Sequence, residues 1–149
     1  MARAAAAHRG LTYRRNHTST HLEWSATLAY AVGLLATDGC LVRDGRHIAF
    51  VTKDEDLMRE WLSCIGHEKL RYARSKSRTG TTICRIQVSE VRLYRFLLSI
   101  GLTPRKSLTL GGVDVPDQFF DHFVRGLLDG DGSTYLRRHR PTRRAYPDY

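Results

Sequence analysis

Two nine-residue segments match each other without a gap, and they constrain the fold more than any other feature of this chain. AVGLLATDG (31–39) and VRGLLDGDG (124–132) agree at five positions, namely Gly33/Gly126, Leu34/Leu127, Leu35/Leu128, Asp38/Asp131 and Gly39/Gly132. Both segments continue an apolar run with helical spacing. A glycine on an apolar helix face allows a second helix to approach closely, and an aspartate after the last turn then lies at the edge of that contact. The two segments therefore predict packed helices that bring Asp38 and Asp131 side by side.

The chain between these segments predicts alternating hairpins and helices. Strands at 40–43 and 46–52 flank Asp44-Gly45, a dipeptide typical of a two-residue hairpin. Further predicted elements are a helix over 54–66, a hairpin over 69–89, a helix capped by Ser89 and ending at Gly101, and a helix after Pro116. The endings EWLSCIG (60–66) and RFLLSIG (95–101) look alike, which hints at a repeated strand–strand–helix unit.

Length and composition limit the possible classes of protein. The 149 residues suit one domain, and 42% apolar residues can supply a core. The longest uncharged apolar stretch, 24–37, is shorter than the roughly 20 residues of a membrane span, and we expect no secretion signal in the first residues. Cys40, Cys64 and Cys84 have neither disulfide-framework nor zinc-finger spacing. The histidines are scattered, and none is assigned to a metal.

The net charge of +9 predicts a polyanionic partner. The segment 69–89 contains six Lys and Arg residues and no acid. In its second strand Arg85, Gln87 and Ser89 alternate with apolar residues, so that one face of the hairpin is polar and basic. A merely solvated basic surface is the alternative interpretation.

The paired segments resemble the two signature helices of the LAGLIDADG homing endonucleases, and the element order over 20–101 is similar to one half of that family's fold. The resemblance implies an α+β fold, a LAGLIDADG-like αββαββα saddle followed by the motif helix of an incomplete second repeat. It implies that Gly33 and Gly126 lie at the central helix interface. It also implies that Asp38 and Asp131, the acids at the eighth motif position, are catalytic residues that hold Mg²⁺ or another divalent cation. The resemblance further implies a catalytic role for Lys106, at the place of a basic residue that the family tends to keep near the cleft.

Double-stranded DNA is the partner that the resemblance implies, bound by a curved sheet in the major groove. The expected DNA-binding residues are Arg43, Arg46, His47, Lys69, Arg71, Arg74, Lys76, Arg78, Arg85 and Gln87. Arginine and lysine can contact guanine edges and Gln87 can contact adenine, whereas Lys76 and Arg78 suit phosphates better.

The second repeat is expected to be incomplete. The predicted organisation is a basic arm (1–19), a first repeat (20–101), a linker (102–115), a second motif helix (116–132) and an arginine-rich irregular tail (133–149). Because the residues after Asp131 are too few for a second sheet, we expect a truncated and weakly active or inactive member, a homodimer through the motif helices, or a chain completed by a missing half.

The expected function is site-specific, metal-dependent hydrolysis of DNA phosphodiester bonds in the cytoplasm of a prokaryote, associated with the nucleoid, or in an organellar matrix. One alternative is a noncatalytic DNA- or RNA-binding module of the regulator or maturase kind, built on the same saddle. Another is an interaction protein whose basic tail binds polyanions. A third is that the glycines simply pack core helices. A calcium loop at DGDGST is excluded, because Thr134 and Arg140 stand where glycine and glutamate are required.

Overall fold

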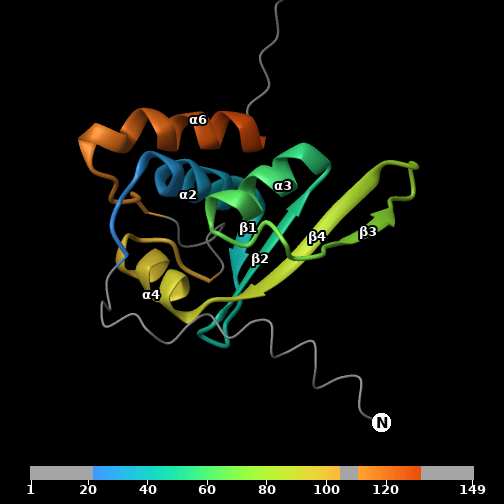
Figure 1. Cartoon of the computed structure of the whole chain (residues 1–149), viewed down its shortest axis with the longest axis horizontal. Helices are drawn as coiled ribbons and strands as arrows, with labels where there is room; N and C mark the ends of the chain where they lie inside the picture. The colour runs from blue at the N-terminus through green and yellow to red at the C-terminus, as the bar shows by residue number, and fades with distance from the viewer. Residues whose placement is uncertain (1–21, 105–110, 132–149) are drawn as a thin grey trace, which may run out of the picture.

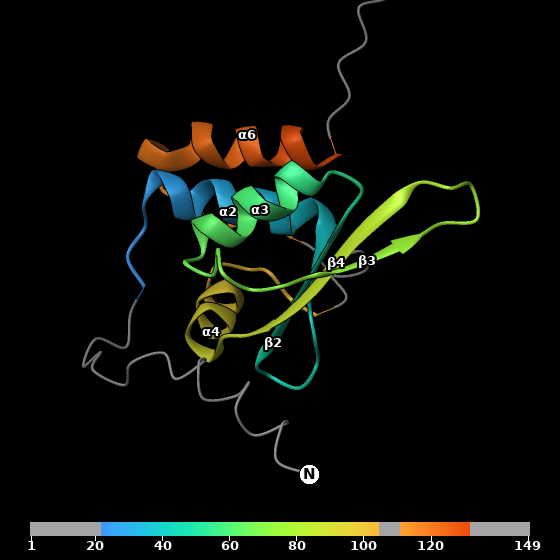
Figure 2. The same cartoon turned by 45° about the vertical axis from the view of Figure 1, so that its right-hand side comes forward.

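A computed structural model describes residues 22–104 and 111–131 of the chain. Its elements are α2 (Ala26–Asp38), β1 (Gly39–Leu41), β2 (His47–Thr52), α3 (Glu55–Cys64), β3 (Ala73–Lys76), β4 (Thr82–Ser89), α4 (Val91–Ser99), the short 3-10 helix η2 (Asp117–Phe119) and α6 (Phe120–Asp131). The predicted α+β class is confirmed. Figures 1 and 2 show α6 lying along α2, on the side of α2 that faces away from the sheet.

The four strands form one antiparallel sheet in the order β1-β2-β4-β3. Ile48 is paired with Val88 and Phe50 with Ile86, so the buried side chains of β2 and β4 share one face. That face packs against the helices. The alternate residues of β4, among them Arg85 and Gln87, are exposed on the opposite face. This second face is called the open face below.

Aromatic residues hold the helices on the sheet. Phe50 stacks on Trp61 of α3 with their ring centroids 4.7 Å apart, and both side chains are fully buried. Tyr94 of α4 donates its hydroxyl hydrogen to the carbonyl of Val42, at 2.6 Å. Burying a side chain of this size contributes about 1.5–3 kcal/mol, so these contacts fix where α3 and α4 sit.

The repeated strand–strand–helix unit is present. β1, β2 and α3 are followed by β3, β4 and α4, and both helices end in the same way. After α3, Gly66 has φ +75° and the amide of His67 bonds the carbonyl of Leu62; after α4, Gly101 has φ +103° and Leu102 bonds Leu97. A glycine in this conformation ends a helix and satisfies its last carbonyls. The similar endings EWLSCIG and RFLLSIG therefore reflect similar structure.

Two local predictions are wrong. The first hairpin turns through four residues, 43–46, instead of two, because Asp44 bonds the amides of Arg46 and His47 and Val42 pairs with His47. Ser89 does not cap α4. It remains in the ladder opposite His47, and Glu90 occupies the N-cap position without a side-chain hydrogen bond.

Strand β3 is shorter than predicted. Regular pairing begins at Ala73, so 69–72 lead into the sheet without belonging to it. The predicted arm (1–19), the tail (133–149) and Lys106 lie outside the described residues. Within the described ranges, no helix combines the length and the apolar character that crossing a membrane requires.

Candidate functional site

The helices α2 and α6 cross at the two glycines that the paired segments share. A Cβ added at Gly33 would lie 2.2 Å from the carbonyl oxygen of Phe123 and 2.9 Å from the Cα of Gly126. One added at Gly126 would lie 2.3 Å from the carbonyl oxygen of Tyr30 and 3.0 Å from the Cα of Gly33. Tyr30 and Phe123 occupy the same position relative to their segments. The contact is therefore reciprocal, with local twofold pseudosymmetry.

The same symmetry recurs one turn further along. A Cβ at Gly130 would lie 2.0 Å from Oγ1 of Thr37, and these two residues hold equivalent positions in their segments. The helices thus stay close from the glycine crossing towards their carboxyl ends. Asp38 and Asp131 are the next residues along, and each is the last residue of its helix, so the two helices end near each other.

A polar clamp adds to this packing. The Tyr30 hydroxyl donates to Asp129 at 2.9 Å, while Arg125 lies 3.5 Å from the same carboxylate oxygen and 4.9 Å from the centroid of the Tyr30 ring. Burial, together with the hydrogen bond to Asp129, raises the pKa of Tyr30. Asp129 therefore holds α6 on α2.

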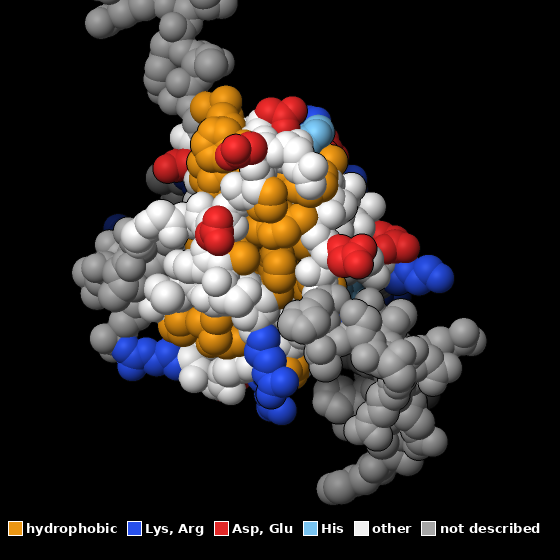
Figure 3. All heavy atoms as spheres, turned by 90° about the vertical axis from the view of Figure 1, so that its left-hand side faces the viewer, with side chains coloured by type: hydrophobic (Ala, Val, Ile, Leu, Met, Phe, Trp, Pro, Cys, Tyr) orange, Lys and Arg blue, Asp and Glu red, His pale blue; other side chains and the backbone are white. Residues whose placement is uncertain are grey.

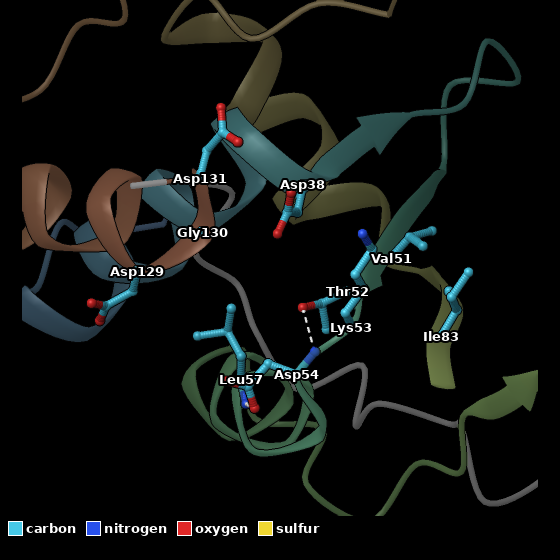
Figure 4. Close-up of a pocket in the computed structure, with 10 residues that line it drawn as sticks. All are labelled: Asp38, Val51, Thr52, Lys53, Asp54, Leu57, Ile83, Asp129, Gly130 and Asp131. Atoms are coloured by element: carbon cyan, nitrogen blue, oxygen red, sulfur yellow. Dashed lines mark hydrogen bonds between the residues drawn. The ribbon is translucent and has the colours of Figure 1, made fainter. Parts of the chain in front are cut away.

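A hollow of about 390 Å³ opens at the carboxyl ends of the two helices. Its lining residues are Asp38, Val51, Thr52, Lys53, Asp54, Leu57, Ile83, Asp129, Gly130 and Asp131. Figure 4 shows the end of β2 and the end of α6 on opposite sides, with Asp38 between them. Asp38 faces the hollow, and the side chains of Asp129 and Asp131 leave α6 in other directions.

The donor set suits a hard cation. Carboxylate oxygens are preferred ligands of Mg²⁺, which commonly takes one or two of them and keeps several waters. Asp38 and Asp131 both line this hollow, and the Asp38 carboxylate is directed into it, whereas the Asp131 side chain would have to turn to reach the same space. In the described part of the chain, no group of three or more histidine, cysteine, aspartate or glutamate side chains is arranged to hold a metal. A bound Mg²⁺ would therefore have to be partly coordinated by water or substrate.

Sequence reasoning missed two residues of this hollow. Lys53 brings a positive charge to the wall opposite α6, and Thr52 is a buried polar residue whose Oγ1 accepts from the amide of Asp54 at 3.1 Å. Thr52 is the last residue of β2, and Lys53 follows it directly. The change from alternating strand residues to Thr-Lys-Asp marks the end of the strand, but nothing local to it indicates that α6 lies across from it.

The predicted DNA-binding residues separate into groups. Arg85 and Gln87 are on the open face, together with His47, which lies opposite Ser89. Arg43 and Arg46 are exposed in the turn at one end of this face. His47 pairs with Asp44 through its ring nitrogen, and this hydrogen bond lowers the pKa of Asp44 to about 2.

The second hairpin distributes its basic residues differently. Arg74 is paired in register with Cys84, whose side chain is buried under the helices, so Arg74 points to the helix side of the sheet. There it contacts Glu55 of α3. Lys76 is on the same side and bonds Thr82 at 3.0 Å. Lys69, Arg71 and Arg78 are exposed outside the regular strands.

The outer side of α6 carries exposed apolar residues. Phe120 is 51% exposed and Leu128 is 56% exposed, whereas Leu35, the equivalent of Leu128 on α2, is 4% exposed. Figure 3 shows a band of hydrophobic side chains on the face where α6 begins, with acidic side chains beside its upper part. Because α6 occupies the glycine face of α2, a homodimer through that face would require α6 to move away.

Comparison with known protein families and with curated proteins finds no match for this chain.

Proposed function

We propose that this chain is a divalent-metal-dependent DNA endonuclease of the LAGLIDADG homing type, with a LAGLIDADG-like saddle as its first repeat. The observation that carries the proposal is the reciprocal crossing at Gly33 and Gly126. It brings the carboxyl ends of two matching helices to one hollow, with Asp38 and Asp131 in its lining. Two pseudosymmetric carboxylates suit a reaction on two antiparallel strands of a duplex.

In this proposal, Asp38 and Asp131 provide the protein oxygens that hold Mg²⁺ or another divalent cation. Such a cation polarises a phosphodiester, lowers the pKa of water and stabilises the leaving oxygen. Lys53 contributes a positive charge that attracts a scissile phosphate to the hollow and holds it there. Lys106, which lies outside the described residues, keeps the role that the family resemblance gives it.

The open face supplies the DNA contacts in this proposal. Arg85 and Gln87 can reach base edges from β4, since guanidinium and amide groups match guanine and adenine respectively. Arg43 and Arg46 extend the same surface at the hairpin turn. Phosphate contacts from these arginines would make binding fall steeply with salt.

In this proposal, a further unit packs against the exposed side of α6. The pseudosymmetry relates Leu128 to Leu35, which is covered by the rest of the repeat on the far side of α2. A second sheet-bearing unit against Phe120 and Leu128 would complete a two-sided DNA-binding surface. With both units present, the protein would contact two half-sites of a DNA duplex, whereas one unit can contact only one.

A noncatalytic DNA- or RNA-binding module is the second candidate. It is favoured by Figure 4, in which the Asp38 and Asp131 side chains do not converge on one point. The saddle and its open face would then serve binding alone.

Cleavage of a randomised duplex library by the purified chain separates the two candidates. The endonuclease proposal predicts Mg²⁺-dependent cleavage that is lost in Asp38→Asn and Asp131→Asn and kept in Asp121→Asn, an exposed aspartate on α6. Salt-sensitive binding without cleavage would overturn the endonuclease and favour the binding module. Absence of both binding and cleavage would contradict both candidates.

A further inference from the structure

A second cluster of positive charge lies at the outer edge of the sheet, away from the open face. A shallow hollow of about 570 Å³ is lined by Arg59, Arg71, Tyr72 and Arg74. Arg59 comes from α3, Arg71 and Tyr72 come from the segment that leads into the edge strand β3, and Arg74 belongs to β3 itself. The register places Arg74 on the helix side, opposite to Arg85 on the same sheet. A ligand in this hollow would therefore bind independently of one on the open face.

One carboxylate organises three of these side chains. Oε1 of Glu55 accepts hydrogen bonds from the Tyr72 hydroxyl at 2.6 Å, from Arg59 at 3.0 Å and from Arg74. The Arg74 guanidinium also lies 5.5 Å from the centroid of the Tyr72 ring. The Tyr72 hydrogen bond, and then the Arg74 charge, lower the pKa of Glu55, which keeps the carboxylate ionised. Holding long side chains in place before a ligand arrives reduces the entropy that binding costs.

The arginines retain unused donors. A guanidinium has five N–H donors; Arg59 directs donors to Glu55 and Asp56, and Arg74 directs one to Glu55. Arg71 is exposed, and it makes no hydrogen bond or ion pair with another residue that the structure describes. Three positive charges thus face two carboxylates, one of which, Asp56, is 93% exposed. The cluster is left with an excess of positive charge and free donors around an open space.

We propose that Arg59, Arg71 and Arg74 form a binding site for a phosphate group on the helix side of the sheet. Phosphate is the class of ligand that fits, because planar guanidinium groups bind its oxygens in a bidentate manner. The shape is open enough to admit a phosphate carried by a larger molecule. The proposal does not depend on the endonuclease function, because none of these arginines lines the hollow at the carboxyl ends of α2 and α6.

The site is tested by titrating the ¹⁵N-labelled full chain with inorganic phosphate at constant ionic strength and following backbone amide shifts. We expect saturable shifts in β3 and the first turn of α3. Arg71→Gln and Arg59→Gln should each raise the Kd at least about tenfold, as the loss of a charge-assisted hydrogen bond implies. The control variant Arg95→Gln, exposed on α4 and outside both proposed binding surfaces, should bind like the wild type.

Three results would overturn the site. These are shifts that do not saturate, unchanged phosphate affinity in Arg71→Gln and Arg59→Gln, and an equal loss of affinity in Arg95→Gln. Because Arg71 is exposed, its variant should keep the wild-type unfolding midpoint, so a loss of binding there is separable from misfolding.

Competition then identifies the source of the phosphate. Adenosine monophosphate and a ten-nucleotide single strand are each used to displace inorganic phosphate. Displacement by the strand at a much lower concentration, lost in Arg71→Gln, supports the site and assigns it to a nucleic-acid backbone. Equal displacement by the mononucleotide supports the site and assigns it to a small phosphorylated molecule. Failure of both to displace phosphate contradicts the proposal.

Discussion

Gly33 and Gly126 contact each other through their backbones and hold equivalent positions in α2 and α6, which are related by local twofold pseudosymmetry. The Cα of each glycine lies within 3.0 Å of the position that a Cβ on the other would take. This relationship explains why the two nine-residue segments share glycine at the same position. It also explains why their aspartates reach the same hollow, because two helices related in this way present equivalent residues on the same side.

Gly33→Ala should destabilise the chain by about 1–3 kcal/mol, the usual cost of overpacking a close contact. The added methyl group would meet the backbone of Phe123, which cannot move without shifting α6. The measurement is the free energy of unfolding in urea. Gly111→Ala is the matched control, because a Cβ there has nothing within 4 Å, and its free energy should stay close to that of the wild type. Equal effects of the two changes would mean that the helices do not cross at Gly33.

Leu35→Ala and Leu128→Ala should differ sharply although the residues are equivalent by pseudosymmetry. Truncating the buried Leu35 should lower the free energy of unfolding by about 2–5 kcal/mol. Truncating the exposed Leu128 should change it by no more than about 0.5 kcal/mol. Chemical denaturation of the two variants checks this. A large loss for Leu128→Ala in the isolated chain would show that the outer side of α6 is already covered.

Tyr30→Phe should lower the free energy of unfolding by about 1–2 kcal/mol, because it removes the hydrogen bond to Asp129 and leaves the carboxylate with Arg125 alone. Asp129→Asn alters the same contact. A double-mutant cycle should therefore give a clear coupling energy between the two residues. Strict additivity would contradict the clamp.

Asp44→Asn should change how stability depends on acid pH. The folded-state pKa of Asp44, about 2, lies below its ordinary value of 3.8, so the ionised carboxylate stabilises the fold above about pH 4. This contribution is lost as the pH falls towards 2. The free energies of wild type and Asp44→Asn should consequently converge over that interval. Asp56→Asn, at a site 93% exposed, is the control, and convergence of the same size there would argue against the Asp44–His47 contact.

Much of the fold follows from the sequence because its signals are local. The Asp54 side chain caps α3 by bonding two amides of the first turn, and Gly66 and Gly101 end their helices with positive φ. The glycine spacing of the paired segments likewise predicts a close helix contact, and the structure has one at those residues.

The remaining features depend on partners that are distant in the chain. The pairing of Arg74 with Cys84 places Arg74 on the helix side, where Glu55, 19 residues earlier, accepts its hydrogen bond. The two-residue spacing between Tyr72 and Arg74 indicates that they share a face, but not which partner Arg74 meets there. Lys53 reaches the hollow because α6 packs across from β2. The first turn is wider than Asp44-Gly45 alone suggests, because the Asp44 side chain binds the backbone beyond it.

Calorimetric titration of Mg²⁺ into the full chain tests the central claim, that Asp38 and Asp131 act as one metal site, most directly. The account predicts one saturable binding event that is weakened at least about tenfold in both Asp38→Asn and Asp131→Asn, since each variant loses one charged ligand. Asp121→Asn should bind like the wild type. Binding that is unchanged in Asp38→Asn, or no binding to the wild-type chain at all, would contradict the account.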